Sequence, residues 1–342
     1  MSKKNYYAED DFDKYEQYAE QFDPLVNNRQ ARRKRKANVK YKPKRTKNQI
    51  LSEIADTTTA EGDFSPTYQP ARYEAGWLLD SIRPFYDEEF ITDVLSNIKG
   101  GKEASVYRCR AHRGTDRPLL AAKVYRPRRF RNLRNDKQYR DGRPMLTGEG
   151  RTIKTNDHRI MRAVGKKTEF GAEVEHISWL MYEYTTLQIL FDAGGAVPQP
   201  LAASENAILM DFIGDANTAA PALNETSLDA KQAEVLFREV LRNIELMLKH
   251  QLIHGDLSAY NILYWDGKIT IIDFPQVVNS RTNPDARFIL ERDVTRVCDY
   301  FSQQGVICDP VTIARDFWER YLAPNPEDQA ADESRQLMNI EA

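Results

Sequence analysis

The chain has 342 residues, of which 41% are hydrophobic and 29% charged, and its formal net charge at pH 7 is −2. This length suffices for one large domain or two modest ones with a substantial apolar core. The three cysteines are widely spaced, which excludes a disulfide framework and indicates a reducing, cytoplasmic location, and no run of about 18 apolar residues predicts a membrane span.

The first 75 residues differ in composition from the rest of the chain. Residues 29–47 carry many Lys and Arg side chains and no Asp or Glu, and the residues before them are acidic and rich in tyrosine. Because apolar periodicity is poor, we predict a largely disordered, charged extension over residues 1–75. The basic tract 29–47 is a candidate for binding RNA phosphates, with Tyr41 available for stacking. A solvated tail that pairs with the acidic opening is the alternative.

Strand-like and helical segments then follow in an order typical of an α+β protein with two lobes. The expected strands cover residues 91–97, 104–110, 119–125 and 208–212. Helices are expected over residues 172–191, from a capping-box start at 226–229 to about 248, over 285–301 and over 311–321. The expected divisions are a folded region at 76–325, with lobes at about 76–210 and 214–325, and a polar tail at 326–342.

The most informative residues are two acids and an amide at fixed spacing between apolar runs. Asp256 and Asn261 lie in the segment 252–263, and Asp273 follows the apolar residues 269–272. Phosphoryl transfer from ATP uses one carboxylate to receive the acceptor's proton, and an amide and a second carboxylate to hold magnesium. We therefore predict that Asp256 is catalytic and that Asn261 and Asp273 are metal ligands. Taken alone, Asp256 would be an ordinary helix-end or turn carboxylate and Asn261 an ordinary turn residue.

The residues between Asn261 and Asp273 predict how these two side chains come together. Residues 265–268 read as a tight turn between two short strands, which brings Asn261 and Asp273 to the same end of a hairpin. A carboxylate after an apolar run is costly to bury unless it is paired or bound to a metal. His254 is predicted to be a structural hydrogen-bonding residue rather than an acid or a base.

A second group of candidates lies in the first strands. Gly100, Gly101 and Lys102 form a turn whose backbone amides can approach phosphate oxygens, although an ordinary Gly-Gly hairpin turn is the alternative. Lys123 lies in the middle of an apolar strand, where it needs an anionic partner. Nucleotide phosphates and the carboxylate of Glu183, on the next helix, are the predicted partners.

Taken together, these motifs resemble the RIO family of atypical serine/threonine protein kinases. The resemblance covers roughly residues 91–300, in the correct order. It rests on residues 101–107 (Gly-Lys-Glu-Ala-Ser-Val-Tyr), the spacing of Trp179 and Glu183, and residues 254–264, 272–276, 283–286 and 290–294.

The resemblance implies a two-lobed protein-kinase-like fold, with an antiparallel sheet and one helix in the N-lobe and a mainly helical C-lobe. It implies binding of ATP with Mg²⁺ or Mn²⁺, catalytic roles for Asp256, Lys123 and Glu183, and metal ligation by Asn261 and Asp273. Residues 210–213 are implied to form the adenine-facing hinge. The implied nucleotide contacts are Gly100, Gly101, Lys102, Glu103, Ala104, Val106, Lys123, Met210, Phe212, Ile213 and Leu263.

The activity implied by the resemblance is transfer of the γ-phosphoryl group of ATP to Ser, as autophosphorylation, or to water, in maturation of the small ribosomal subunit. The expected partner is RNA or a pre-ribosomal particle, bound through the basic tracts 29–47 and 126–143, and no membrane is involved. The second tract is equally a candidate for a disordered surface loop. Gly255 replaces the usual arginine and no Ala-Pro-Glu segment follows Asp273, which argues against a conventional peptide-docking platform.

Two other functions remain open at this stage. A small-molecule phosphotransferase of the aminoglycoside-kinase type shares the His-Gly-Asp and Ile-Asp-Phe motifs. An RNA-binding assembly factor could use its nucleotide site as a conformational switch with negligible turnover. The Gly-Lys-Glu-Ala turn at 101–104 and the spacing of Trp179 and Glu183 favour the RIO-type enzyme over the small-molecule phosphotransferase.

Overall fold

The structure, a computed structural model, describes residues 64–101, 103–126, 143–154, 157–166 and 168–322. The basic tract 29–47, Lys102, nearly all of the second basic tract and the expected C-terminal tail therefore lie outside the described residues. The chain divides into two compact units. The first, called here the sheet unit, comprises Met1–Asn132, Ala172–Leu180 and Gln199–Ala219. The second, the helical unit, comprises Leu133–Gly171, Met181–Pro198 and Ala220–Ala342.

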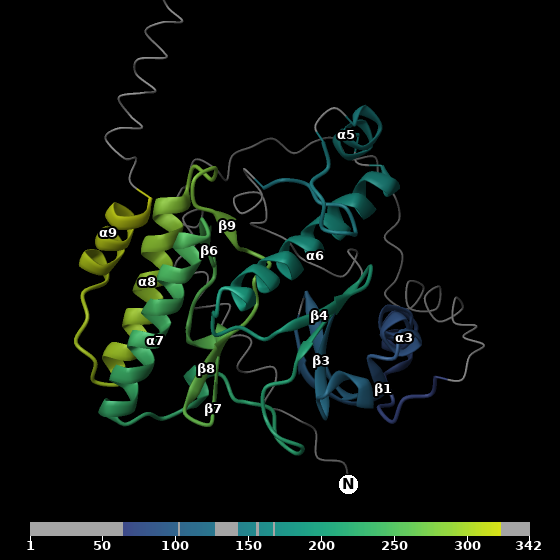
Figure 1. The fold of residues 1–342 in the computed structure, drawn as a ribbon, viewed down its shortest axis with the longest axis horizontal. Helices are drawn as coiled ribbons and strands as arrows, with labels where there is room; N and C mark the ends of the chain where they lie inside the picture. The colour runs from purple at the N-terminus through teal and green to yellow at the C-terminus, as the bar shows by residue number, and fades with distance from the viewer. Residues whose placement is uncertain (1–63, 102, 127–142, 155–156, 167, 323–342) are drawn as a thin grey trace, which may run out of the picture. The chain divides into compact units, whose positions relative to one another are not determined.

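The sheet unit is built on five antiparallel strands in the order β1-β2-β3-β5-β4 (Figure 1). The strands are β1 (Ile91–Gly100), β2 (Ala104–Ala111), β3 (Leu119–Tyr125), β4 (Pro200–Ala203) and β5 (Ala207–Asp211), with the 3-10 helix η2 (Arg113–Thr115) between β2 and β3. The four strands predicted from the sequence are confirmed. Strand β4 was not foreseen, because it is short and begins with a proline, which an edge strand tolerates.

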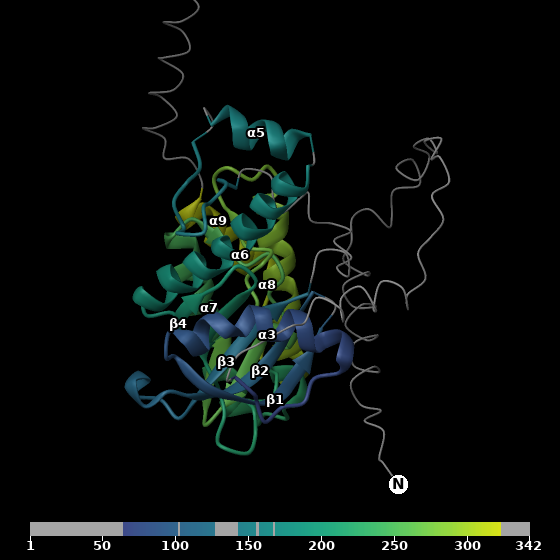
Figure 2. The same ribbon diagram turned by 90° about the vertical axis from the view of Figure 1, so that its right-hand side faces the viewer.

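One face of this sheet packs against helix α3 (Arg72–Asp87), which crosses β1, β2 and β3 in Figure 2. Helix α3 was not predicted, and it starts before the expected boundary at residue 76. Alternate residues of β2 and β3 are fully buried in this core: Tyr107, Cys109, Leu120, Ala122 and Val124. Since successive strand residues point to opposite faces, Val106 and Lys123 lie on the face away from α3, directly opposite each other in the ladder.

The helical unit is built around three packed helices and short strands. Its helices are α5 (His158–Gly165), α7 (Ala230–Lys249), α8 (Ala286–Gln303) and α9 (Pro310–Tyr321), with the 3-10 turns η4 (Leu223–Glu225) and η5 (Ala259–Asn261). Its strands are β6 (Leu252–Ile253), β7 (Ile262–Trp265), β8 (Lys268–Ile271) and β9 (Val278–Asn279). Helices α7, α8 and α9 lie side by side in Figure 1. Among the described residues, no helix is long and apolar enough to cross a bilayer.

Helix α7 delivers the chain to the candidate site, as the sequence predicts. Its N-cap is Asp229, whose side chain accepts from the backbone N–H of Gln232 at 2.8 Å, and the Gln232 side chain accepts in return from Asp229 N–H. This capping box satisfies backbone donors that a helix start leaves unpaired. The buried face of α7 includes Phe237, Val240 and Ile244, which recur at helical spacing.

Helix α6 (Glu169–Asp192) contributes residues to both units. It starts three residues before the predicted bound, because Thr168 caps it by accepting from the N–H of Gly171 at 3.1 Å. In the sheet unit, Trp179 packs edge-on against Tyr125, with ring centroids 4.7 Å apart. The sheet unit thus contains α3 in addition to the single helix that was expected.

Candidate active site

The two acids and the amide of the predicted site all lie in the helical unit, on one loop and the hairpin that follows it. They are Asp256, Asn261 and Asp273. Strands β7 and β8 pair in register from Ile262 opposite Ile271 to Trp265 opposite Lys268. The two turn residues, Asp266 and Gly267, both have positive φ, as a tight hairpin turn requires. This confirms the predicted hairpin.

The pairing extends past the strand ends toward the candidate metal ligands. The carbonyl oxygen of Asn261 accepts from the N–H of Ile272 at 2.9 Å. Asn261 therefore faces the residue that precedes Asp273, so both candidate ligands come to the same end of the hairpin. Asp273 itself has φ of 72°, an uncommon backbone conformation for a residue with a side chain. Such conformations are held by their surroundings and gather at functional sites.

The side chains of Asn261 and Asp256 are joined directly. The Nδ2 of Asn261 donates to the backbone oxygen of Asp256 at 2.9 Å and to its Oδ2 at 3.2 Å. Both partners are acceptors, so the amide nitrogen must face them and the Oδ1 of Asn261 must face the other way. That orientation leaves an amide oxygen for a hard cation such as Mg²⁺, which prefers oxygen ligands.

His254 holds the loop in place through both ring nitrogens. Its Nδ1 accepts from the N–H of Asp256 at 3.2 Å, and its Nε2 lies 3.1 Å from the backbone oxygen of Ile272. An N–H only donates and a carbonyl only accepts, so the ring carries its proton on Nε2. The ring also packs on Phe274, with centroids 4.6 Å apart. The predicted structural role of His254 is confirmed.

Gly255 occupies a position that only glycine fits. Its φ is +84°, and a Cβ there would lie 2.2 Å from the backbone oxygen of Gln276. Its N–H donates to the Oδ2 of Asp293 at 2.8 Å, and its carbonyl oxygen accepts from Arg292. The absence of an arginine at 255 thus has a structural reason, because the backbone is clamped between Gln276 and helix α8.

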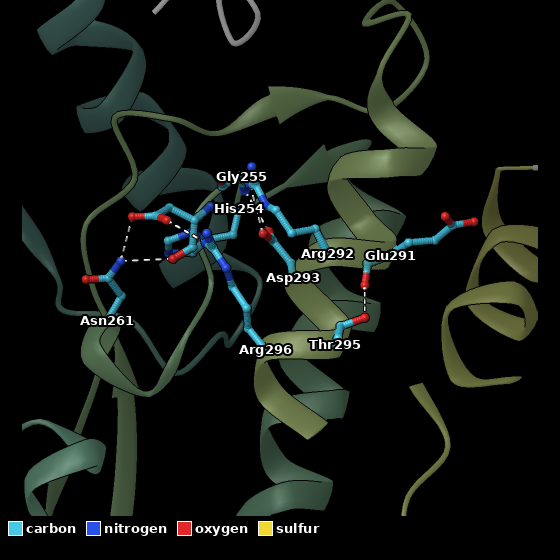
Figure 3. A network of polar contacts seen from close by, with 9 residues as sticks. His254, Gly255, Asn261, Glu291, Arg292, Asp293, Thr295 and Arg296 are labelled. Carbon is cyan, nitrogen blue, oxygen red and sulfur yellow. Dashed lines mark hydrogen bonds and ion pairs between the residues drawn. The ribbon is translucent and has the colours of Figure 1, made fainter. Parts of the chain in front are cut away.

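Three charged residues of α8 lie beneath this loop, and with Asp256 they form what we call the buried charge cluster: Asp256, Arg292, Asp293 and Arg296. Figure 3 shows the three α8 side chains reaching toward His254 and Gly255, with Asn261 on the far side. The Nη1 of Arg296 lies 2.7 Å from the Oδ1 of Asp256, and Arg292 pairs with Asp293 at 3.2 Å. All four residues are buried.

Sequence reasoning missed the role of Arg296, and it noted Arg292 and Asp293 only as part of a resemblance. A signal was present, because Asp293 and Arg296 recur at helical spacing with the apolar Ile289. An acid and a base on the apolar stripe of a helix indicate that both are buried and paired. The sequence does not identify the partner on the loop.

The segment that contains Asp273 is held by residues of α6 and by the residue that ends the second basic tract. The carboxylate of Glu183, 1% exposed, accepts from the N–H of Phe274 at 3.3 Å. Arg143 donates to the backbone oxygen of Pro275 at 2.9 Å, and its guanidinium lies 4.8 Å from the ring centre of Tyr182. Burial raises the pKa of Tyr182, and the Arg143 charge opposes that rise.

The sheet unit carries the predicted phosphate-side residues. Gly101 N–H donates to the backbone oxygen of Ala104 at 2.8 Å, which closes a tight turn between β1 and β2. Lys123 is 8% exposed, and its Nζ lies 5.3 Å from the ring centre of Tyr125. Lys123 and Glu183 belong to different units, so their pairing stays a prediction.

The remaining nucleotide candidates divide between the units. In the sheet unit, Glu103 and Ala104 flank the start of β2, and Val106 follows on that strand. Met210 pairs with Ala121 in the β3–β5 ladder, and Phe212 and Ile213 follow directly after β5. Phe212 also lines a cavity of ≈ 500 Å³ in this unit. Leu263 lies on β7, in the helical unit.

The chain matches known proteins over most of this region. The family described as the RIO domain matches residues 105–313. RIO-type serine/threonine-protein kinase Rio1 of Haloferax volcanii is 30% identical over 215 residues, which are 62% of this chain and 64% of that protein. Serine/threonine-protein kinase RIO1 of Chaetomium thermophilum is 30% identical over 231 residues, or 64% of this chain and 41% of that protein. The chain thus matches less than two thirds of the length of either relative.

Among solved structures, the Rio2 kinase–ADP/Mg²⁺–phosphoaspartate complex from Chaetomium thermophilum aligns with a TM-score of 0.51 and 19% identity, covering 84% of this chain and 79% of that one. At this identity the likeness establishes the fold alone. It confirms the expected α+β class, a two-lobed protein-kinase-like fold with an antiparallel sheet in one lobe and a mainly helical second lobe. The RIO domain matches well over half of the length of this chain, and the chain therefore belongs to the RIO family.

Proposed function

We propose that the chain is an ATP- and magnesium-dependent RIO-type serine/threonine kinase or ATPase. The observation that carries this proposal is the bond of Asn261 to Asp256 at the end of the β7–β8 hairpin where Asp273 follows Ile272. Asp256 orients the acceptor hydroxyl or water and receives its proton. The Oδ1 of Asn261 and the carboxylate of Asp273 hold magnesium, which when bound neutralises charge on the phosphates.

The donor set fits the proposed metal. An amide oxygen and a carboxylate are the ligands that Mg²⁺ accepts, commonly together with phosphate oxygens and water. The forced orientation of the Asn261 amide supports this fit. The Rio2 structure from Chaetomium thermophilum holds ADP and Mg²⁺, which supports the same pair of ligands here. Mn²⁺ prefers similar oxygen ligands and is the alternative metal.

The proposed nucleotide contacts follow from membership of the RIO family. The turn from Gly100 to Val106, including Lys102, covers the phosphates with backbone amides, and Lys123 adds a positive charge. Glu183 braces the segment that contains Asp273, and its pairing with Lys123 stays a prediction. Residues 210–213 are the proposed adenine contacts of the sheet unit, and Leu263 is the one proposed in the helical unit.

The family match favours this activity over a small-molecule phosphotransferase of the aminoglycoside-kinase type. We further propose that the acceptor is a Ser of this chain or water, and that the enzyme acts on RNA-containing particles of small-subunit maturation. The basic composition of the tracts 29–47 and 126–143 supports RNA as the partner, because phosphate contacts by Lys and Arg supply most of non-specific affinity. A cytoplasmic location stays a prediction.

The test is a turnover assay with γ-labelled ATP and Mg²⁺, which follows both phosphate release and label on the protein. Asp256→Asn should lower the rate by about 100-fold or more, the usual scale for losing an acid–base group, and Asp273→Asn should lower it because it removes a charged ligand of the metal. Asp266→Asn is the matched control, because Asp266 is an exposed acid at the turn of the same hairpin. Wild-type rates in both site variants would contradict the proposal.

Added RNA and an added aminoglycoside separate the partner hypotheses in the same assay. Faster turnover with RNA, at a rate that falls with salt, supports the RNA-linked enzyme. Transfer of label to the aminoglycoside would support the small-molecule phosphotransferase. A wild-type chain that binds ADP and Mg²⁺ but shows negligible turnover would favour the nucleotide switch.

A further inference from the structure

The predicted catalytic carboxylate is bonded to an arginine from a distant part of the chain. The Nη1 of Arg296 lies 2.7 Å from the Oδ1 of Asp256, and the two side chains are only 4% and 11% exposed. Arg296 lies on α8, forty residues after Asp256 in the sequence. It belongs to none of the predicted nucleotide or metal contacts, so the proposed function gives it no role.

Stability alone does not explain this pair. Moving two charges out of water is costly, and a well-packed apolar pair of similar volume is often as stable or more so. A buried ion pair at this position therefore indicates that the orientation of the Asp256 carboxylate has to be fixed. Arginine meets such a requirement better than lysine, because its planar guanidinium holds a carboxylate in a fixed orientation.

The two oxygens of Asp256 have different partners. Oδ1 is bonded to the Arg296 guanidinium, and Oδ2 lies 3.2 Å from the Nδ2 of Asn261. The Nδ2 of Asn261 is nearer to the backbone oxygen of Asp256, at 2.9 Å. The bond from Asn261 to Oδ2, at 3.2 Å, is longer than the bond from Arg296 to Oδ1, at 2.7 Å, so an incoming hydroxyl or water displaces it more easily. While the acceptor replaces Asn261 at Oδ2, the bond from Arg296 fixes the plane of the carboxylate.

We propose that Arg296 is a positioning residue, which holds Oδ1 of Asp256 so that Oδ2 faces the phosphoryl acceptor. In this role Arg296 acts on the reaction through its bond to Asp256. This inference rests on the proposed function, because it assumes that Asp256 orients the acceptor. In phosphoryl transfer the protein contributes mainly positioning and charge, so a device that fixes one carboxylate affects the rate directly.

The test compares Arg296→Ala and Arg296→Lys with Arg287→Ala. Arg287 is the matched control, since it lies on the same helix in an exposed pair with Glu291. The measurements are kcat, the KM for ATP, the dissociation constant of a fluorescent ADP analogue with Mg²⁺, and thermal unfolding. For Arg296→Ala we expect kcat to fall about 10- to 100-fold, as is typical on removing a partner that orients a functional group. We expect the KM and the dissociation constant to change less than about twofold, because the partner of Arg296 is Asp256, which is predicted to act on the acceptor and not on the nucleotide.

Rescue of kcat by added guanidinium ion distinguishes a positioning role from a merely structural one. A merely structural role predicts no rescue. Guanidinium should restore part of the kcat of Arg296→Ala and leave Arg287→Ala unchanged. Arg296→Lys keeps the positive charge, and it is the variant to test if Arg296→Ala does not fold. We expect it to bind ADP like the wild type and to lose about tenfold in kcat, because a point charge does not fix the carboxylate plane.

Two results would overturn the inference while the proposed function stands. One is a folded Arg296→Lys with wild-type kcat. The other is an Arg296→Ala that loses ADP binding and turnover together without rescue by guanidinium, which would make Arg296 a structural residue only. A wild-type chain without phosphoryl transfer would remove the proposed function and this inference with it.

Discussion

The two units of the molecule bury different kinds of side chain. The core of the sheet unit, between β1–β3 and α3, is largely apolar, and its buried polar groups include Ser81 and the hydroxyl of Tyr107, which donates to Glu74. The helical unit instead places the buried charge cluster under the loop that contains Asp256. The apolar core gives a stable platform, whereas the charges fix the orientation of particular groups.

This difference has an energetic consequence. An apolar core loses stability in proportion to the contacts removed, but a buried charge that loses its partner leaves an uncompensated ion. Single substitutions near the site of the helical unit should therefore lower the free energy of unfolding more than the loss of packing contacts alone would. The predictions below test that contrast, from the largest expected effect to the smallest.

The sharpest contrast is between a buried and an exposed ion pair of the helical unit. Arg292→Leu leaves Asp293 without its buried partner and should lower the free energy of unfolding by about 3–5 kcal/mol. Arg238→Leu breaks an exposed pair with Glu234 and should cost less than about 1 kcal/mol. Urea unfolding of both variants measures the difference. Equal losses in the free energy of unfolding would mean that breaking the buried pair costs no more than breaking the exposed pair.

The second contrast is between two glycines with similar backbone conformation. Gly255→Ala meets the backbone oxygen of Gln276 at 2.2 Å and must also adopt a left-handed φ, so we expect a loss of about 2–4 kcal/mol. Gly267→Ala has a similar φ but open space around it, so only the backbone cost of about 1–2 kcal/mol remains. Thermal unfolding compares the two. A Gly255→Ala variant as stable as Gly267→Ala would contradict the close approach.

The third prediction concerns the buried hydroxyl of Tyr107 in the sheet unit. Burial, followed by the hydrogen bond to Glu74, raises the pKa of Tyr107 above its ordinary value of 10.0. A raised pKa means that the protonated phenol stabilises the fold fully below pH 10 and that this contribution is lost as the pH rises further. Tyr107→Phe should therefore cost about 1–3 kcal/mol at pH 8, and the difference from the wild type should shrink above pH 10. Denaturant midpoints across that range measure it, and a difference that grows with pH would refute the assignment.

Sequence reasoning found the chemistry of the site because that chemistry is local. Asp256 and Asn261 lie on one loop, and the turn at 265–268 brings Asp273 beside Asn261 through a short hairpin. The strands of the sheet and the helices α7, α8 and α9 follow from apolar periodicity for the same reason. These features depend on residues close in sequence, which a single chain displays.

The missed features depend on distant residues. Arg296 reaches Asp256 from forty positions away, and the bond of Tyr107 to Glu74 joins a strand to a helix that was not predicted. Helix α3 escaped prediction because it follows a polar extension and contains Pro84 near its end. A charge on an apolar helix stripe indicates burial, but its partner is set by the tertiary fold.

The roles assigned to the site are tested most directly by the magnesium dependence of single-turnover phosphoryl transfer from ATP. If Asp273 holds the metal, Asp273→Asn should raise the Mg²⁺ concentration that gives half the maximal rate. If Asp256 acts on the acceptor, Asp256→Asn should lower the maximal rate by about 100-fold or more and leave that Mg²⁺ concentration unchanged. Identical magnesium curves for the two variants, or a wild-type maximal rate in Asp256→Asn, would contradict the account.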